Sequence, residues 1–315
     1  MIEISNLVKR YGRNYAVNDI SFNVGKGEIV GFLGPNGAGK TTTMNILTGY
    51  LSATSGSVKI AGYDILDNPM EAKKHIGYLP EQPPLYLDMT VKEYLGFVFD
   101  LKRCTFNKKK HIEEIVEILN IGNYYKRPIN QLSKGYRQRV GIAQALVSSP
   151  DILVFDEPTV GLDPKQIIEI RDLITSLGKE HTVILSTHIL PEVNAVCDRV
   201  VIIDKGRIVA NEKTSELEAV SGMRKMIVKV CGPVQEVLGC LGATQGVKSI
   251  EIMPGHDAGS TSYLVESETN VDVRKPIFNT LASKGYPMIG LEGFSASLED
   301  VFIAIIDKNK KEENK

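Results

Sequence analysis

The sequence predicts an α/β fold made of a large unit followed by a small one. Short, continuous apolar runs, which are typical of parallel strands buried on both faces, alternate with helix-like segments. A mainly helical stretch interrupts this alternation, and near Ser221-Gly222 a new series of strands and helices begins. We therefore expect a mixed-sheet core with an antiparallel β part and a helical part, and a small α+β unit after it.

Two half-buried antiparallel strands are expected over residues 2–24, because apolar residues partly alternate there and Tyr11-Gly12 divides the run. The elements that follow are a buried strand Ile29–Leu33, a helix Thr41–Leu47 with Gly49 as its stop, a strand Gly56–Ala61, a short helix Met70–Lys74, and a strand Ile76–Leu79 that ends in a proline-rich loop.

The loop Gly34-Pro35-Asn36-Gly37-Ala38-Gly39-Lys40-Thr41 is predicted to bind phosphate. Its glycines leave backbone N–H groups free to approach a phosphate, and the following helix adds its positive end. Lys40 can reach the β- and γ-phosphates, and the Thr41 hydroxyl can hold Mg²⁺. A flexible glycine turn is the alternative, but the preceding strand and the following helix favour the phosphate site.

From Thr90 to about Gly135 the sequence predicts a helical insert. Thr90 and Glu93 have the spacing of a capping box. In the second helix the apolar residues Ile112, Ile115, Val116 and Leu119 follow the i, i+3, i+4, i+7 pattern. We interpret Lys108–Lys110 as a solvated face rather than a phosphate-binding patch, because the run is short and lacks interleaved aromatic residues.

Two further buried strands each lead to polar residues. Ile152–Phe155 stops at Asp156-Glu157, and Thr182–Leu185 leads to Ser186-Thr187-His188. Because ligands bind at the carboxyl ends of strands in open α/β sheets, we expect a site there. A helix-capping acidic pair and a histidine that braces a strand end are the simpler alternatives. Further elements are a helix from Ser133 that ends before Pro150, a helix begun by Asp163-Pro164, and a hairpin of Arg199–Ile203 and Arg207–Val209 around Lys205-Gly206.

The last third of the chain predicts a ferredoxin-like unit with the order β-α-β-β-α-β and one added helix. The expected strands are Met226–Val230, Val247–Met253, Tyr263–Val265 and Met288–Leu291, and the expected helices are Val234–Leu241, Val271–Lys284, with a start as late as Pro276, and Leu298–Ile306. Residues 307–315 are all polar and predict a disordered tail. His256 lies in an expected turn, where a surface loop explains it better than a metal does.

Bulk composition excludes several classes of protein. A formal net charge of −1 gives no general attraction to nucleic acid. No apolar stretch approaches the ~18–20 residues of a membrane-spanning helix, and the N-terminus lacks a signal peptide, so we expect a cytosolic chain. Cys104, Cys197, Cys231 and Cys240 form no C-x-x-C pair, which favours free thiols over disulfides or a zinc site.

Taken together, residues 1–215 resemble the nucleotide-binding subunit of an ATP-binding cassette (ABC) transporter. The decisive segment is Leu132-Ser133-Lys134-Gly135-Tyr136-Arg137-Gln138-Arg139, which is similar to the family signature L-S-G-G-Q and departs from it at Lys134 and Tyr136. The resemblance implies a P-loop NTPase cassette over residues 1–220, with its helical insert at about 88–149. An accessory ferredoxin-like domain would then occupy residues 223–306.

The resemblance also implies a role for each matching residue. Tyr11 would stack on adenine, although a packed aromatic is the simpler interpretation of a lone tyrosine. Glu157 would be the catalytic base, His188 would contact the γ-phosphate, and Gln82, a weak signal by itself, would ligate Mg²⁺ and sense the membrane partner. The other implied nucleotide-binding and metal-binding residues are Gly34, Asn36, Gly37, Ala38, Gly39, Lys40, Thr41 and Thr42 at the phosphates, Ser133, Gly135 and Asp163 at the opposite subunit, and Asp156 at Mg²⁺ through water.

The function implied by this resemblance is ATP hydrolysis that drives a transporter, with ATP and Mg²⁺ as cofactors. Two copies, or one copy and a homologous cassette, would pair head to tail on a separate transmembrane permease at the inner face of the cell membrane. The segments Tyr136–Arg139 and Ser297–Phe302 resemble the bacterial exporter branch with multidrug, lantibiotic-immunity and gliding cassettes, which favours export.

The alternative is a non-transport ATPase of the same superfamily that acts as a soluble regulatory or nucleic-acid-linked factor. We disfavour it because the sequence holds neither tandem cassettes nor a heptad run. No nucleic-acid partner is expected. A GTPase is disfavoured as well, because the N-K-x-D base-reading motif does not occur.

Overall fold

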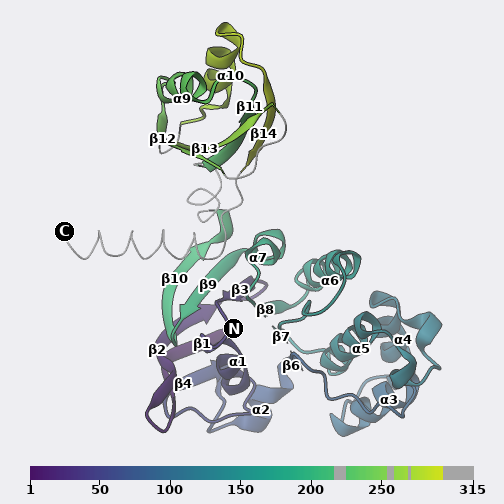
Figure 1. Ribbon diagram of the computed structural model, residues 1–315. Coiled ribbons are helices and arrows are strands. Elements are labelled where there is room, and N and C mark those ends of the chain that lie inside the picture. The colour runs from purple at the N-terminus through teal and green to yellow at the C-terminus, as the bar shows by residue number, and fades with distance from the viewer. Residues whose placement is uncertain (216–224, 254–258, 269–270, 294–315) are drawn as a thin grey trace. The chain divides into compact units, whose positions relative to one another are not determined.

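The computed structural model describes residues 1–215, 225–253, 259–268 and 271–293 (Figure 1). The chain divides into two compact units, residues 1–214 and 215–315, and each is described by itself. The predicted helix at 298–306, the polar tail at 307–315, the segment 297–302 and His256 lie outside the described residues.

A six-stranded sheet forms the centre of the first unit. Its strand order is β10 (Arg207–Lys213), β9 (Arg199–Asp204), β3 (Ile29–Leu33), β8 (Thr182–Thr187), β7 (Ile152–Asp156), β6 (Ile76–Leu79). Neighbours are parallel except for the β9–β10 hairpin. Every residue of β3, β7 and β8 is buried, which is the physical reason for their continuous apolar sequences. Both β7 and β8 extend beyond the predicted ends, so that Asp156 and Thr187 are themselves strand residues.

A second, antiparallel sheet packs against the first. Its order is β2 (Asn14–Val24), β1 (Ile2–Tyr11), β4 (Ser55–Ile60), β5 (Tyr63–Asp64). One apolar core joins both sheets and the helix α1 (Lys40–Leu47), which contributes Met44 and Leu47. Across this core the rings of Phe22 on β2 and Phe32 on β3 lie 5.5 Å apart. The alternation over residues 2–24 therefore reflects one face on the core and one face in solvent. A short helix, α2 (Pro69–Lys74), follows β5.

The predicted helical insert contains α3 (Val91–Leu101), α4 (Lys108–Ile118) and α5 (Lys134–Leu146), which gather together in Figure 1. Short 3₁₀ turns at Gly122–Tyr124 and Ile129–Gln131 connect α4 to α5. The capping box forms as expected, because Thr90 accepts from the Glu93 N–H at 3.2 Å and donates its own N–H to the Glu93 carboxylate at 2.9 Å. Lys108 and Lys110 form exposed ion pairs with Asp100 and Glu114, as befits a solvated face.

Two helices complete the first unit: α6 (Pro164–Leu177) and α7 (Leu190–Val196). Asp163 caps α6 by accepting the Gln166 N–H at 2.9 Å. Sequence analysis did not predict α7, which has seven residues and carries Pro191 in its first turn. Its side chains Leu190, Val193 and Val196 are buried. Val193 packs so closely on β3 that a Cβ at Gly31 would lie 2.8 Å from it.

The second unit has the predicted ferredoxin-like order. Its elements are β11 (Lys225–Val230), α9 (Val234–Gly242), β12 (Val247–Ile252), β13 (Thr261–Ser267), α10 (Arg274–Ser283) and β14 (Met288–Gly293), and the antiparallel strands lie in the order β12-β13-β11-β14. Alternate residues of β11 and β13 form a core with α9 and α10. The helix α10 begins at Arg274 rather than Val271, so Pro276 lies in its first turn, where a missing N–H costs no hydrogen bond.

Within the described ranges, no helix is both long and apolar enough to cross a lipid bilayer.

Candidate functional site

A pocket of about 370 Å³ opens where β3, β7 and β8 end. It is lined by residues of the glycine-rich loop and by side chains that follow these strands: Ala16, Asn36, Gly37, Gly39, Lys40, Thr41, Thr42, Glu81, Glu157, Val160 and His188. The carboxyl ends of parallel strands thus converge on one cavity, as expected for an open α/β sheet.

The glycine-rich loop is pressed against neighbouring strands. Gly39 precedes α1 with φ +111°, and a Cβ at this position would lie 2.3 Å from the carbonyl oxygen of Ala16 on β2. A Cβ at Gly34 would lie 2.4 Å from the Ile203 carbonyl oxygen. The Gly206 N–H donates to the Ala38 carbonyl at 2.9 Å. Gly34 and Ala38 therefore support the loop from behind, while its other predicted residues face the pocket.

Lys40 lies at the base of the pocket and is only 6% exposed. Its ammonium group donates to the carbonyl oxygens of Gly34, at 2.9 Å, and Pro35, at 3.2 Å. The same Nζ lies 3.3 Å from Oε1 of Glu157. A cation that is held by the loop's own carbonyl groups and aimed at the cavity is suited to an anionic ligand.

Glu157 and His188 line the pocket and contact each other. Oε2 of Glu157 lies 3.0 Å from Nδ1 of His188. The backbone of Glu157 is left-handed, with φ +50°, and its N–H donates to both the carbonyl and the hydroxyl oxygen of Ser186, each at 3.1 Å. This bonding fixes the carboxylate where β7 and β8 end. A buried carboxylate paired with a histidine can orient a water molecule and accept its proton.

Asp156 is fully buried, and only one of its carboxylate oxygens accepts a hydrogen bond from the described residues. Ser186 donates its hydroxyl to Oδ1, whereas Oδ2 has no hydrogen-bond partner among the residues that the structure describes. Burial and the nearby Asp156 carboxylate raise the pKa of Tyr78 above its ordinary value. An orphaned buried carboxylate oxygen fits a hard cation such as Mg²⁺, which takes oxygen ligands.

Two predicted site residues, Tyr11 and Gln82, are not among the residues that line the pocket. Tyr11 ends β1 and is 53% exposed, and the Lys9 ammonium lies 5.2 Å from its ring centre. Gln82 is exposed, and the preceding residue, Glu81, lines the pocket. Within the described part of the chain, neither Tyr11 nor Gln82 contributes to the lining.

Ser133, Gly135 and Asp163 form a separate group, at the N-termini of α5 and α6. The Ser133 hydroxyl accepts the Tyr136 N–H at 3.4 Å, so Ser133 is the cap residue of α5. A Cβ at Gly135 would lie 2.7 Å from the Gln166 side chain of α6, which brings the two helix starts together. These three residues are not among those that line the pocket.

Three lining residues had no role in the sequence analysis: Ala16, Glu81 and Val160. Ala16 belongs to β2 and reaches the loop only through packing of the two sheets, so no local pattern identifies it. Glu81 and Val160 lie one and three residues from predicted site residues, but nothing in the sequence shows which way a loop side chain points.

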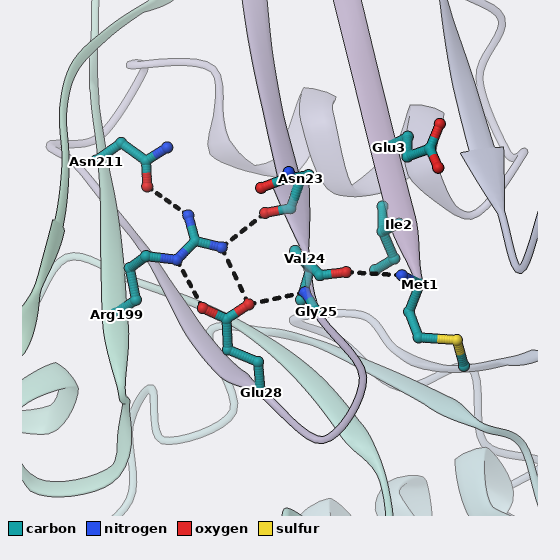
Figure 2. A pocket seen from close by; sticks show the side chains of 9 residues that line it. All are labelled: Met1, Ile2, Glu3, Asn23, Val24, Gly25, Glu28, Arg199 and Asn211. Carbon is teal, nitrogen blue, oxygen red and sulfur yellow. Dashed lines mark hydrogen bonds and ion pairs between the residues drawn. The ribbon is translucent and has the colours of Figure 1, made fainter.

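A second pocket, of about 530 Å³, is lined by nine residues, several of which hydrogen-bond to each other (Figure 2). The Arg199 guanidinium donates to both carboxylate oxygens of Glu28, at 2.6 and 3.1 Å, and to the Asn23 carbonyl and the Asn211 side chain. The hydrogen bonds from Arg199 hold the pKa of Glu28 below its usual value. This network ties both sheets together, and we interpret it as structural.

Comparison with known proteins places this geometry in context. The family model described as "ABC transporter" matches residues 17–160. The ABC transporter ATP-binding protein YxlF of Bacillus subtilis (strain 168) is 34% identical over 307 residues, which is 97% of this chain and 99% of that protein. The bacitracin transport ATP-binding protein BcrA of Bacillus licheniformis is 41% identical over 210 residues, 66% of this chain and 68% of BcrA. A solved dimer of the ATP-binding cassette MJ0796, in a post-hydrolysis state with ADP and Pi, matches 68% of this chain and 99% of its own, with a TM-score of 0.62 and 27% identity.

Proposed function

Because the chain belongs to the family of ABC transporter ATP-binding proteins and is an ATPase, we propose that it drives an exporter as a head-to-tail pair of cassettes on a separate transmembrane permease. This proposal rests on one observation above all: Lys40, Glu157 and His188 meet within hydrogen-bonding or ion-pair distance in a pocket that the glycine-rich loop lines.

The chemistry of the three side chains supports hydrolysis of a terminal phosphate. Such a reaction needs positive charge at the phosphates and a group that orients the attacking water. In our proposal Lys40 neutralises the phosphates, and Glu157 orients the water and receives its proton. His188 holds Glu157 and contacts the γ-phosphate. The loop residues donate backbone N–H groups to the remaining phosphate oxygens.

We propose Thr41 and Asp156 as the residues that hold Mg²⁺, with Gln82 as a further ligand. Support for the first two comes from the pocket-facing position of Thr41 and from the orphaned Oδ2 of Asp156. When bound, the metal ion supplies positive charge to the β- and γ-phosphates.

The pairing of two cassettes is proposed because part of the expected nucleotide site lies outside the pocket. Ser133, Gly135 and Asp163 lie together at two helix N-termini, where an anion binds favourably, and we propose that they meet the nucleotide of the other copy. A twofold arrangement of this kind closes on itself and creates two equal sites. Tyr11, half exposed at the end of β1, is our candidate for stacking on adenine.

Export and a permease are proposed from the relatives. BcrA is named for bacitracin transport, and we propose that this chain also serves transport, in the direction of export. The cassette would then lie on the inner face of the cell membrane, bound to its permease. The C-terminal unit, as an accessory domain over about residues 223–306, is proposed to regulate or reinforce the pairing.

The substitution Glu157→Gln tests the proposal. It removes the base but keeps a side chain of the same size, so we expect ATP binding to persist while turnover falls by about 10²–10⁴-fold. ATP should also trap the variant as a dimer in size-exclusion chromatography. Glu180→Gln, on the exposed surface, is the matched control. Unchanged hydrolysis in Glu157→Gln would contradict the role of Glu157.

Co-purification from detergent-solubilised membranes tests the permease. We expect a hydrophobic membrane subunit to remain bound to the tagged chain. Recovery of the chain without such a subunit would contradict the transport proposal and favour a non-transport ATPase of the same superfamily.

A further inference from the structure

A buried glutamate on α7 contacts both segments that carry the proposed catalytic pair. Glu192 is 1% exposed. Its Oε1 accepts the Thr159 hydroxyl at 2.7 Å, and its Oε2 accepts the Thr187 hydroxyl at 2.9 Å. Nη2 of Arg171, on α6, lies 3.9 Å from Oε1. Because a buried charge is costly without such partners, the site has a reason to retain all three contacts.

The two threonines lie next to the residues that face the pocket. Thr159 comes two residues after Glu157, and Thr187 immediately precedes His188. Both threonines are buried, with 4% and 0% exposure, so water cannot replace their partner. Ser186 already joins the two segments at the strand ends, through its bonds with Asp156 and the Glu157 N–H. Beyond the strands they meet directly, where Glu157 contacts His188 at 3.0 Å, and again through the single carboxylate of Glu192.

The chemistry of this second point fixes hydroxyl orientations. An ionised carboxylate only accepts hydrogen bonds, so both threonine hydroxyls must donate to it. The Thr187 hydroxyl oxygen then remains an acceptor for the Ile189 N–H, which donates to it at 3.1 Å. This bond holds the turn that carries His188 between β8 and α7. The orientation of His188 is thus linked, through one buried carboxylate, to the segment that follows Glu157.

We propose that Glu192 is a positioning residue for ATP hydrolysis, which keeps Glu157 and His188 in register by holding Thr159 and Thr187 together. The inference rests on the proposed roles of Glu157 and His188. Glu192 is not among the residues that line the pocket, so we expect it to affect turnover rather than nucleotide binding. The competing interpretation is that Glu192 only secures α7 to the sheet.

A double-mutant cycle with Thr159→Val and Thr187→Val separates the two interpretations. Each substitution keeps the shape of the side chain and removes one hydroxyl. If the link matters, either change alone breaks it, and we expect kcat to fall about tenfold with the affinity for a fluorescent ATP analogue changed less than threefold. The double variant should then lose no more turnover than either single variant.

Two further variants complete the design. Glu192→Gln retains an acceptor for Thr187 but puts an amide N–H group in place of Oε1, where it faces the Thr159 hydroxyl and Nη2 of Arg171. It should therefore lower kcat about as much as either threonine substitution, and wild-type kcat in this variant would contradict the inference. Thr175→Val, on the exposed side of α6, is a control for a lost threonine hydroxyl and should behave as wild type in turnover and melting temperature.

The outcomes are distinguishable. If the losses in kcat multiply in the double variant, the two threonines act independently, and the inference alone is overturned. It is overturned in the same way if the variants lower the melting temperature and the ATP affinity while kcat stays unchanged, because that result shows a merely structural role. Wild-type turnover that survives Glu157→Gln would overturn the proposed catalytic pair, and the inference with it.

Discussion

Replacing Gly39 by alanine should damage the phosphate loop in a way that the geometry makes calculable. The new Cβ would lie 2.3 Å from the Ala16 carbonyl oxygen, whereas real Cβ atoms essentially never come closer than 3.0 Å, so the backbone must move by about 0.7 Å. Alanine also pays a penalty of about 1–2 kcal/mol for positive φ. Together we expect a loss of about 2–4 kcal/mol in folding free energy.

The same displacement should weaken nucleotide binding. A shift of the loop that spoils one charge-assisted N–H···O bond costs about 1.5–3 kcal/mol, which is about a ten- to hundredfold loss of affinity. Because the chain has no tryptophan, binding is best followed with a fluorescent ATP analogue. Thermal unfolding is followed by circular dichroism.

Alanine substitutions at two other glycines separate the effects of backbone strain, of steric collision and of lost ligand binding. A Cβ at Gly56 meets the Asn6 carbonyl oxygen at the same 2.3 Å, also at positive φ, but this glycine does not line the pocket. Gly62 has φ +88° with nothing within 4 Å. We expect Gly56→Ala to lower the melting temperature as much as Gly39→Ala, by roughly 5–15 °C, with ATP affinity retained. Gly62→Ala should cost about half as much.

A different ranking would refute this reasoning. If Gly62→Ala destabilised the protein as much as Gly56→Ala, the close approach to a carbonyl oxygen would not be the cause. If Gly39→Ala bound the ATP analogue like the wild type, the loop would tolerate the displacement, and its backbone would not be the phosphate cradle.

Two further predictions concern carboxylates. Because Arg199 lowers the folded-state pKa of Glu28 below 4.5, the ion pair stabilises the fold above that pH and less as pH falls through the lowered value. Glu28→Gln should therefore be less stable than the wild type at pH 7, by about 1 kcal/mol in the free energy of unfolding measured by thermal melting. This difference in stability should shrink as the pH falls below 4.5, and a difference independent of pH would contradict the prediction. Asp156→Asn keeps an acceptor for Ser186 but replaces the orphaned oxygen by an N–H group, so Mg²⁺ should stimulate its ATP hydrolysis at least tenfold less. Stimulation equal to that of the wild type, titrated with MgCl₂, would exclude Asp156 from the metal site.

The parts of the fold that could be predicted are those in which burial leaves a pattern in the sequence. β3, β7 and β8 are buried on both faces, so every position is apolar or small until the strand ends. The helix α7 leaves no such pattern, because it is short and because its buried face includes Glu192. A buried glutamate looks like a surface residue until its three partners are known.

The site divides in the same way. Lys40, Glu157 and His188 were predictable because each follows a buried strand at a recognisable spacing, and parallel strands bring their ends together. Which side chain of the proline-rich loop enters the pocket was not predictable, since prolines impose no period, and Glu81 lies there instead of Gln82. Ala16 was inaccessible to sequence reasoning because sheet-on-sheet packing alone brings it to the loop.

The position of β3 has a consequence for biosynthesis. This strand lies between β8 and β9, so the early strand that presents the phosphate loop finds its partners only in late segments of the chain. At about 5–20 residues per second, the ribosome needs roughly 8–30 s to pass from β3 to β8. During that interval Ile29–Leu33 has no partner strand. An exposed apolar strand of this kind binds chaperones or aggregates with other chains. The helices α3 and α4, made meanwhile, contact each other locally and need not wait.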